Sequence, residues 1–340
     1  MVFPTPPATL KVATAGEALI DLIEDADGRL RPCAGGAVYN LTRALGLQGV
    51  GTLYLNPLAG DRFGRLLAEG MAQAGVALAQ PQPVHEPTSL AVVGLDAQGK
   101  ASYSFYREGV ADRQVSAPGL IAACEAPPGL PDLRIAVTGC LALVAEDSAK
   151  YLPWLQAQRA AGRLVVVDAN LRPAIVPDMS AYRSSVMAAL QQAHLIKVSD
   201  DDLDTLGVPG GDALAKASAL LAGTRAQWLA LTLGAGGAVL LARDGHAWHC
   251  AESTPVTVVD TVGAGDCFLA GLLVALLQRP ALQRSAHADE LRLNASDAQH
   301  LLAHAVASAS LCVMQTGCTP PSLPEVVART TAHPPVFRAL

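Results

Sequence analysis

The sequence has few aromatic residues and no long uninterrupted apolar segment. Phe, Trp and Tyr together make up 4% of its 340 residues. The longest plainly apolar run, residues 267–277, is far shorter than the ~20 residues that span a bilayer. Residues 1–9 are Pro-rich and lack the charged start and the apolar stretch of a secretory signal peptide. We therefore expect no membrane partner and a cytoplasmic location.

The sequence also lacks an excess of positive charge. It has 24 Lys and Arg against 30 Asp and Glu, which gives a formal net charge of −6. Proteins that bind nucleic acid typically carry a basic surface that neutralises phosphates. We therefore expect no nucleic-acid partner.

Paired cysteines and two common nucleotide-binding motifs are missing as well. Seven cysteines are scattered along the chain without a C-x-x-C pair, so spacing predicts neither a disulfide framework nor a zinc site. We interpret the cysteines as small apolar core residues. Residues 94–101 nearly fit a P-loop but lack its Ser or Thr, and no G-x-G-x-x-G follows a strand. P-loop and Rossmann proteins are thereby disfavoured.

What the sequence does contain is a large apolar fraction in alternating strand-like and helix-like segments. Hydrophobic residues make up 51% of the chain. Residues 164–168, 195–198 and 228–232 are apolar except for Asp168, Lys197 and Thr232, and segments with helical spacing separate them. Such strands imply a mainly parallel sheet with helices on both faces. We predict one α/β domain over residues 10–330, with irregular tails at 1–9 and 331–340.

Two segments interrupt this alternation. Residues 89–94 and 101–107 flank a turn at 96–99, and side chains alternate along residues 102–107, which is typical of a half-exposed hairpin. A second short strand pair is predicted within residues 21–32. We expect both pieces, within 21–32 and 89–112, to form one small antiparallel β-sheet lid that projects from the core and covers a site.

The most specific chemistry lies in residues 256–277. A strand-like VTVV leads into DTVGAGD, and an apolar helix follows. Gly263, Ala264 and Gly265 leave the N–H groups at the helix start open to an anion, and the helix dipole adds positive potential there. The carboxylate of Asp266 can accept a proton from a hydroxyl that attacks this anion. We interpret Asp266 as a general base beside an anion hole.

The segment around Asp266 resembles the C-terminal signature of the PfkB (ribokinase-like) family of sugar kinases. Other segments resemble family motifs in the same order along the chain: GEALID (16–21), GGAVYN (35–40), DRFG (61–64), DANLR (168–172), KVSDDD (197–202), TLGAGG (232–237) and GCTP (317–320). This resemblance implies a ribokinase-like fold, with a three-layer α/β/α core and a β lid. It also implies an enzyme that phosphorylates a sugar hydroxyl with ATP as co-substrate.

The resemblance implies two groups of binding residues as well. The positions implied for the sugar are Asp21, Gly35, Gly36, Asn40, Arg107, Asn170 and Asp266. The positions implied for ATP are Lys197, Thr232, Gly234, Gly237, Gly263, Gly265 and His304.

Two metal sites follow from the same resemblance. Mg²⁺ would reach the protein through water near Asn170 and Asp200, and Asp200 stands where the family more often has Glu. A monovalent cation such as K⁺ would bind the backbone carbonyls of Asp260 and Val262 behind the anion hole.

The whole-chain resemblance is closest to the family's bacterial fructokinases, which implies fructose as substrate and its O6 as the accepting hydroxyl. An alternative is 2-keto-3-deoxygluconate, whose carboxylate Arg107 would bind through two hydrogen bonds. Ribose and nucleosides are further alternatives. A regulator that binds sugar or nucleotide without catalysis is an alternative of another class, and the presence of Gly263, Gly265 and Asp266 argues against it. The open lid sheet also predicts a homodimer formed through the lids.

Overall fold

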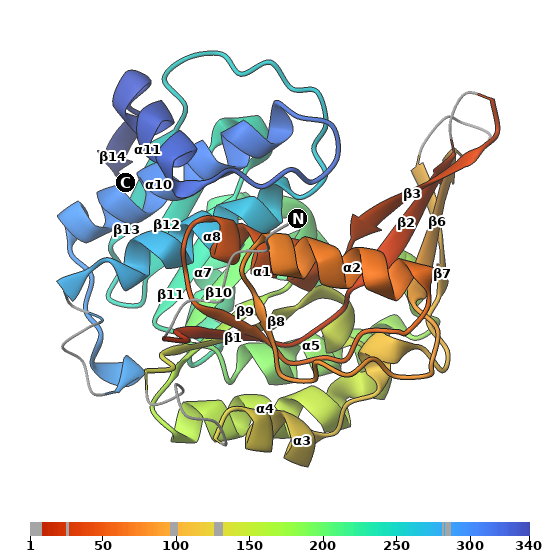
Figure 1. Ribbon diagram of the computed structural model, residues 1–340. Helices are drawn as coiled ribbons and strands as arrows, with labels where there is room; N and C mark the ends of the chain where they lie inside the picture. Colours follow the sequence, from red (N-terminus) through yellow and green to blue (C-terminus); the bar gives the residue numbers. More distant parts are fainter. Residues whose placement is uncertain (1–8, 25–26, 96–100, 126–131, 281, 283–286) are drawn as a thin grey trace.

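A ten-stranded sheet forms the centre of the molecule (Figure 1). The computed structural model describes all residues except 1–8, 25–26, 96–100, 126–131, 281 and 283–286. In spatial order the strands are β14 (Val336–Ala339), β13 (Ala247–Ala251), β12 (Ala238–Ala242), β11 (Trp228–Thr232), β10 (Leu195–Ser199), β9 (Leu164–Asp168), β8 (Ile135–Gly139), β1 (Val12–Thr14), β4 (Thr52–Tyr54) and β5 (Ala77–Leu78). Strands β5 to β11 in this order pair in parallel, whereas β12, β13 and β14 are antiparallel. The predicted, mainly parallel sheet is confirmed.

Helices cover both faces of this sheet because its inner strands are apolar on both sides. Within β9, Val166 belongs to one core and Val165 and Val167 belong to the other. The first core is closed by α1 (Ala37–Leu47), α8 (Ala264–Leu277) and α10 (Ala295–Val313). The second is closed by α3 (Ala117–Ala123), α4 (Ser148–Ala160), α5 (Met179–Leu190), α6 (Asp200–Leu206) and α7 (Ala213–Gly223). Two further helices are α2 (Arg62–Gln73) and α11 (Leu323–Ala332).

A separate four-stranded sheet forms the lid, which projects from the right of the core in Figure 1. Its order is β3 (Leu30–Gly35), β2 (Leu19–Glu24), β6 (Ser89–Leu95) and β7 (Ala101–Tyr106). The two predicted hairpins are confirmed, since β2 pairs with β3 and β6 with β7 in antiparallel register. The sheet is not antiparallel throughout, because β2 and β6 both run outward from the core and pair in parallel. Residues 25–26 and 96–100 of the predicted turns lie outside the described residues.

The predicted irregular tail at residues 331–340 is wrong. Ser322 starts α11 with a capping box in which Glu325 bonds back to it, and a proline in the first turn favours the helix start. The chain then returns as β14, which pairs with β13 from Val336 to Ala339. The sequence pattern did not indicate this edge strand, because it is short and mostly exposed and therefore lacks a buried apolar face. Of the predicted N-terminal tail, residues 1–8 lie outside the described residues.

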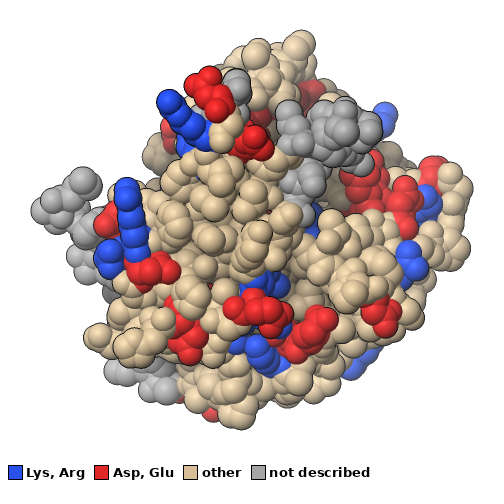
Figure 2. Space-filling view, turned by 90° about the vertical axis from the view of Figure 1, so that its right-hand side faces the viewer, with Lys and Arg blue, Asp and Glu red and all other residues tan. Residues whose placement is uncertain are grey.

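Charge of neither sign dominates the face that carries the end of the lid. Figure 2 shows Lys and Arg interspersed with Asp and Glu in small groups on a mostly uncharged surface. None of the helices that the structure describes has the length and apolar character needed to cross a membrane.

Candidate active site

A cavity of about 370 Å³ lies between the lid and the carboxyl ends of the core strands. Open α/β sheets bind ligands at this edge. The predicted site residues that line the cavity are Asp21, Gly36, Asn40, Asn170, Lys197, Asp260, Val262, Gly263, Gly265 and Asp266. These residues come from segments as much as 245 positions apart in the sequence, so the fold brings the separate motifs to one place.

The anion hole is the start of α8. Gly263 is the N-cap residue and has a left-handed backbone with φ 79°, a conformation that favours glycine. A Cβ there would lie 2.2 Å from Sγ of Cys318. At Gly265, a Cβ would lie 3.0 Å from Nζ of Lys197. The two glycines therefore let the backbone N–H groups, the neighbouring loop and a cationic side chain approach closely.

Asp266 lies in the first turn of α8, and its side chain is nearly buried. Its Oδ2 accepts a hydrogen bond of 2.9 Å from Nδ2 of Asn40. Burial raises the pKa of the Asp266 carboxyl to about 7, and the charge of Asp168 adds to the shift; Asn40, Lys197 and Arg172 oppose it. A carboxyl group with a pKa near neutrality is suited to accept a proton at physiological pH.

A buried ion pair supplies positive charge next to this carboxyl group. Nζ of Lys197 lies 3.0 Å from Oδ1 of Asp168, and both side chains are almost fully buried. Burial raises the pKa of Asp168 to about 6, although Lys197 lowers it. Asp168 ends β9 and Lys197 lies in the adjacent β10, so the parallel register alone brings them together.

The start of α1 provides the second wall of the cavity. Gly36 is its N-cap, with φ 102°, and a Cβ there would lie 2.9 Å from the carbonyl oxygen of Glu17. Oε1 of Glu17 accepts hydrogen bonds from Ala37 N–H (2.9 Å) and Val38 N–H (3.4 Å). Burial raises the pKa of the Glu17 carboxyl to about 7, and the charge of Arg107 partly offsets the shift. Glu17 lines the cavity, and our sequence analysis gave it no role.

Two buried oxygen atoms of this wall have no hydrogen-bond partner among the described residues. They are Oδ1 of Asn40 and Oε2 of Glu17. Leaving such atoms unpaired is unfavourable. Because both residues line the cavity, a ligand with several hydroxyl donors would satisfy them.

The lid contributes a carboxylate of its own. Asp21 lines the cavity from β2, and burial raises its pKa to about 6 while Arg172 lowers it. A Cβ at Gly35 would lie 2.1 Å from Oδ2 of Asp21. Gly35 therefore makes room for the Asp21 carboxylate and does not itself line the cavity.

The loop after β9 adds polar groups opposite the lid. Asn170 lines the cavity and has a positive φ of 35°, which Asn tolerates better than most residues. Asp202 holds this loop, because its Oδ1 accepts a hydrogen bond of 2.7 Å from Leu171 N–H. It also closes the capping box of α6 with Ser199. Asp200, the first residue of α6, is exposed and is not among the described residues that line the cavity.

The predicted nucleotide residues of the next loop follow β11 and are not among the described residues that line the cavity. Thr232 ends β11, and its hydroxyl donates to the carbonyl of Val198 in β10 (3.3 Å). Gly234 and Gly237 have positive φ values in the tight turn that joins β11 to β12. Because β11 pairs in parallel with β10 and Thr232 is in register with Ser199, this turn lies at the same edge of the sheet as the end of β10.

His304 does not belong to the site as the structure describes it. Its ring is buried in α10, and its Nε2 lies 2.8 Å from Oε1 of Gln48, which follows α1. Burial lowers the pKa of His304 to about 4, so the ring is neutral at physiological pH. Helix packing uses this side chain, and His304 is not among the described residues that line the cavity; its contact with ATP stays a prediction.

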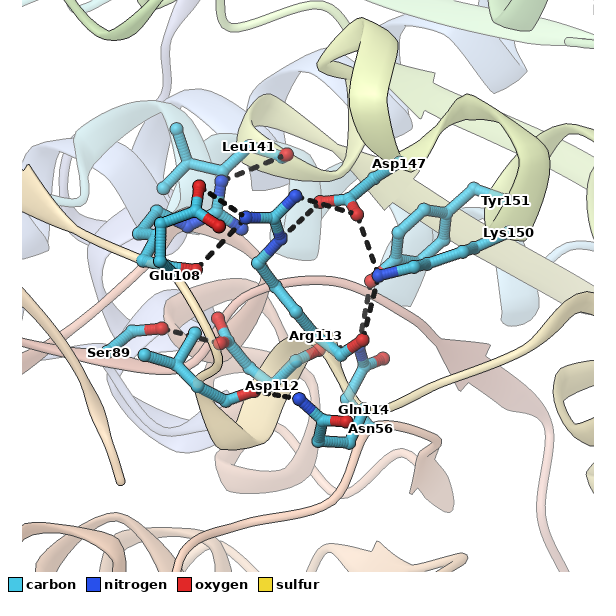
Figure 3. Close-up of polar contacts among 12 residues, drawn as sticks. Asn56, Ser89, Glu108, Asp112, Arg113, Gln114, Leu141, Asp147, Lys150 and Tyr151 are labelled. Carbon is cyan, nitrogen blue, oxygen red and sulfur yellow. Dashed lines mark hydrogen bonds and ion pairs between the residues drawn. The ribbon is translucent and has the colours of Figure 1, made fainter. Parts of the chain in front are cut away.

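Arg107 follows the last lid strand, and its Nη1 donates to the carbonyl of Leu141 (3.5 Å), whereas its Nε has no hydrogen-bond partner among the described residues. It is half-buried and is not among the described residues that line the cavity. Its charge opposes the effect of burial on the pKa values of Glu17 and Asp112. Figure 3 shows the surrounding network, in which Asp112 accepts from Ser89 and Arg113 pairs with Asp147.

Comparisons with known proteins agree with this geometry. Residues 9–326 match the description "pfkB family carbohydrate kinase". This chain belongs to the pfkB family of carbohydrate kinases. The kinase is 33% identical over 273 residues to a fructokinase of Rhizobium leguminosarum bv. trifolii, covering 78% of this chain and 79% of that protein.

Solved structures share the fold of this kinase. It resembles the ATP-bound fructokinase of Xylella fastidiosa with a TM-score of 0.78 and 27% identity, covering 96% of this chain and 98% of the other. It also shares the fold of a Vibrio cholerae O395 fructokinase bound to fructose, ADP and calcium, with a TM-score of 0.76, 23% identity and coverage of 95% and 99%. The ribokinase-like fold of this kinase is therefore shown.

Proposed function

We propose that this kinase transfers the γ-phosphoryl group of ATP to O6 of fructose. The observation that carries the proposal is the buried Asp266 carboxyl group, which lies at the start of the glycine-lined helix α8 and bonds to Asn40. Fructose is inferred as the substrate from the fructokinases among its relatives.

The chemistry follows from this arrangement. Asp266 takes the proton of the O6 hydroxyl as the bond from O6 to phosphorus forms and the bond from phosphorus to ADP breaks. The N–H groups of residues 263–265 stabilise the charge on the transferring phosphoryl group. Lys197 adds positive charge beside them. Most of the catalysis is positioning and electrostatic stabilisation, which suits groups held rigidly by a helix start.

The sugar would lie between the lid and the core. Asp21, Asn40, Glu17 and Asn170 offer hydrogen-bonding groups on three sides of the cavity, and the unpaired oxygens of Asn40 and Glu17 favour a ligand with several hydroxyls. Gly35 and Gly36 would assist by allowing close approach. ATP would extend over the turn that contains Thr232, Gly234 and Gly237.

Mg²⁺ fits the oxygen donors near the phosphates. Asn170 lines the cavity, and Asp200 is an exposed carboxylate at the start of α6, directly after β10. Hard cations bind such groups directly or through water. Bound Mg²⁺ would neutralise phosphate charge. Asp202 is already occupied by Leu171 N–H and the α6 cap, which leaves Asp200 as the freer carboxylate.

A monovalent cation such as K⁺ fits the loop behind the anion hole. Asp260 holds this loop, because its carboxylate accepts from Val262 N–H (3.0 Å) and Gly317 N–H (2.8 Å). The backbone carbonyls of Asp260 and Val262 are the donors proposed for the ion.

We prefer fructose to 2-keto-3-deoxygluconate because the relatives of this kinase include fructokinases. The carboxylate of the keto acid would need a cationic partner such as Arg107, which is not among the described residues that line the cavity.

We further propose a cytoplasmic homodimer that joins through the lids. The lid presents exposed Leu30 and Tyr106 on its two edge strands. All seven cysteines are free thiols, which suits a reducing compartment.

A coupled ADP-release assay tests the function. Fructose, 2-keto-3-deoxygluconate, ribose, adenosine and fructose 6-phosphate are each supplied with Mg-ATP. We expect turnover with fructose that Asp266→Asn lowers by ~10²-fold or more while ATP binding persists. Turnover with the keto acid alone would contradict the proposal that fructose is the substrate. Near-normal turnover of Asp266→Asn would contradict the proposal that Asp266 is the general base.

A further inference from the structure

Three cysteines meet directly behind the anion hole. The Sγ atoms of Cys267, Cys312 and Cys318 all lie within 4.8 Å of one another. They come from the first turn of α8, the end of α10 and the loop that follows α10. Cys267 and Cys312 are fully buried, whereas Cys318 is partly exposed and lines the cavity. The cluster is therefore enclosed on one side and reachable from the cavity on the other.

We propose that these three thiols form a binding site for a thiophilic divalent cation, with zinc as the favoured ion. Three Zn–S bonds of ~2.3 Å place the sulfur atoms roughly 4 Å apart. Sulfur separations of up to 4.8 Å reach this geometry through small side-chain rotations. Binding displaces the thiol protons to solvent, and a water molecule from the cavity would take the fourth position.

The position of Cys267 favours the thiolate that a metal requires. Cys267 is the fourth residue of α8, and the positive end of a helix dipole stabilises a negatively charged sulfur. The same helix start is proposed to stabilise the transferring phosphoryl group. A metal ion bound to Cys267 and the transferring phosphoryl group would therefore both lie at the start of α8, on opposite sides of it.

Contacts connect the cluster to the anion hole. Cys318 packs against Gly263, where an added Cβ would lie 2.2 Å from its Sγ. The Cys312 thiol donates to the carbonyl of Val262 at 3.5 Å. Drawing the sulfur atoms together would shift Cys318 relative to Gly263 and remove the bond to Val262. Zinc should therefore inhibit phosphoryl transfer; this inhibition rests on the proposed function, whereas zinc binding does not.

Metal titration of the reduced protein tests the site. We expect one Zn²⁺ per chain, and one Cd²⁺ per chain with the ultraviolet absorption of cadmium thiolates. Cys312→Ser and Cys318→Ser should each weaken binding by more than ~100-fold, because losing a direct ligand exceeds the 10–100-fold effect of outer contacts. Circular dichroism verifies that each variant is folded.

Cys124→Ser is the matched control. Cys124 is also a buried free thiol, but it lies in the other core, where it accepts from Trp154 Nε1 at 3.5 Å. This variant should bind one ion as the wild type does. Binding that persists in both Cys312→Ser and Cys318→Ser, or the absence of a cadmium–thiolate band in the wild type, would overturn the site.

An activity measurement separates this inference from the proposed function. One equivalent of zinc should lower the turnover of the wild type by about 10-fold or more, since a ~1 Å displacement near reacting groups can cost ~100-fold. A zinc-selective chelator, added with Mg²⁺ in excess, should restore it. Stoichiometric zinc binding with unchanged turnover would contradict the prediction that zinc inhibits phosphoryl transfer. Zinc binding by a protein that shows no kinase activity with chelator would contradict only the proposed function.

Discussion

At the scale of single residues, the protonation of Asp266 controls the proposed reaction. Only the ionised carboxylate can accept a proton, and its pKa is raised to about 7. We predict that kcat/KM for fructose rises with pH, with an apparent pKa near 7.

Asn40→Ala removes the hydrogen bond that favours the ionised Asp266 carboxylate. It should raise the apparent pKa by about one pH unit, which equals ~1.4 kcal/mol. Steady-state rates between pH 5.5 and 9 check both, and an unchanged profile in Asn40→Ala would contradict this coupling.

The same carboxyl group should affect stability with the opposite pH dependence. The unfolded chain loses this proton near the ordinary pKa of 3.8, whereas the folded chain keeps it until about pH 7. Stability from Asp266 is therefore complete below pH 4 and is lost as pH rises through 7. We predict that the Tm of Asp266→Asn, relative to wild type, increases from pH 4 to 7 and then levels off. Thermal unfolding checks this, with the exposed Asp201→Asn as a control whose difference should stay nearly constant.

At the scale of elements, the start of α8 requires glycine for two reasons. Gly263→Ala would place a methyl group 2.2 Å from Cys318 Sγ and would also hold alanine at φ 79°. We predict a loss of ~1–3 kcal/mol in stability and a loss of turnover of ~10-fold or more, because the N–H groups move. Chemical denaturation and steady-state kinetics measure the two effects.

Gly49 provides the matched control for this element. It has a similar φ of 82°, but a Cβ there meets no atom within 4 Å. Gly49→Ala should lose stability from strain alone and keep its turnover. If both variants lose turnover equally, the close contact of Gly263 with Cys318 is not what maintains the anion hole.

At the scale of the whole molecule, an ion-pair network joins the lid to the core (Figure 3). Arg113 follows the last lid strand and donates to both carboxylate oxygens of Asp147, while Lys150 pairs with the same carboxylate. Asp147 is only 1% exposed, so losing Arg113 leaves its charge poorly compensated. We predict that Arg113→Ala costs ~3 kcal/mol in stability and raises the KM for fructose more than the KM for ATP.

The control for the lid is Lys11→Ala. Lys11 precedes β1 and pairs with Asp132 at 3.4 Å, and both side chains are substantially exposed, so its loss should cost about 1 kcal/mol or less and leave both KM values unchanged. Equal increases of the two KM values in Arg113→Ala would mean that the network supports the fold without positioning the lid.

Local sequence patterns determined much of this molecule. Continuous apolar runs such as residues 164–168 predicted buried strands because both of their faces meet helices. Alternation within residues 102–107, next to the turn at 96–99, predicted the lid hairpin, since one face of that sheet meets solvent. The glycines before Asp266 predicted a helix start open to anions. In each case the backbone and side-chain pattern within a few residues was sufficient.

The tertiary structure alone decided which distant residues meet. Asp168 and Lys197 pair through strand register, and Cys267, Cys312 and Cys318 meet through the packing of α8 and α10. Packing also placed the His304 side chain between α10 and the end of α1, where it bonds to Gln48. Such contacts depend on the relative positions of whole elements. Buried area and close packing determine how helices pack on a sheet, and the spacing of residues in the sequence does not.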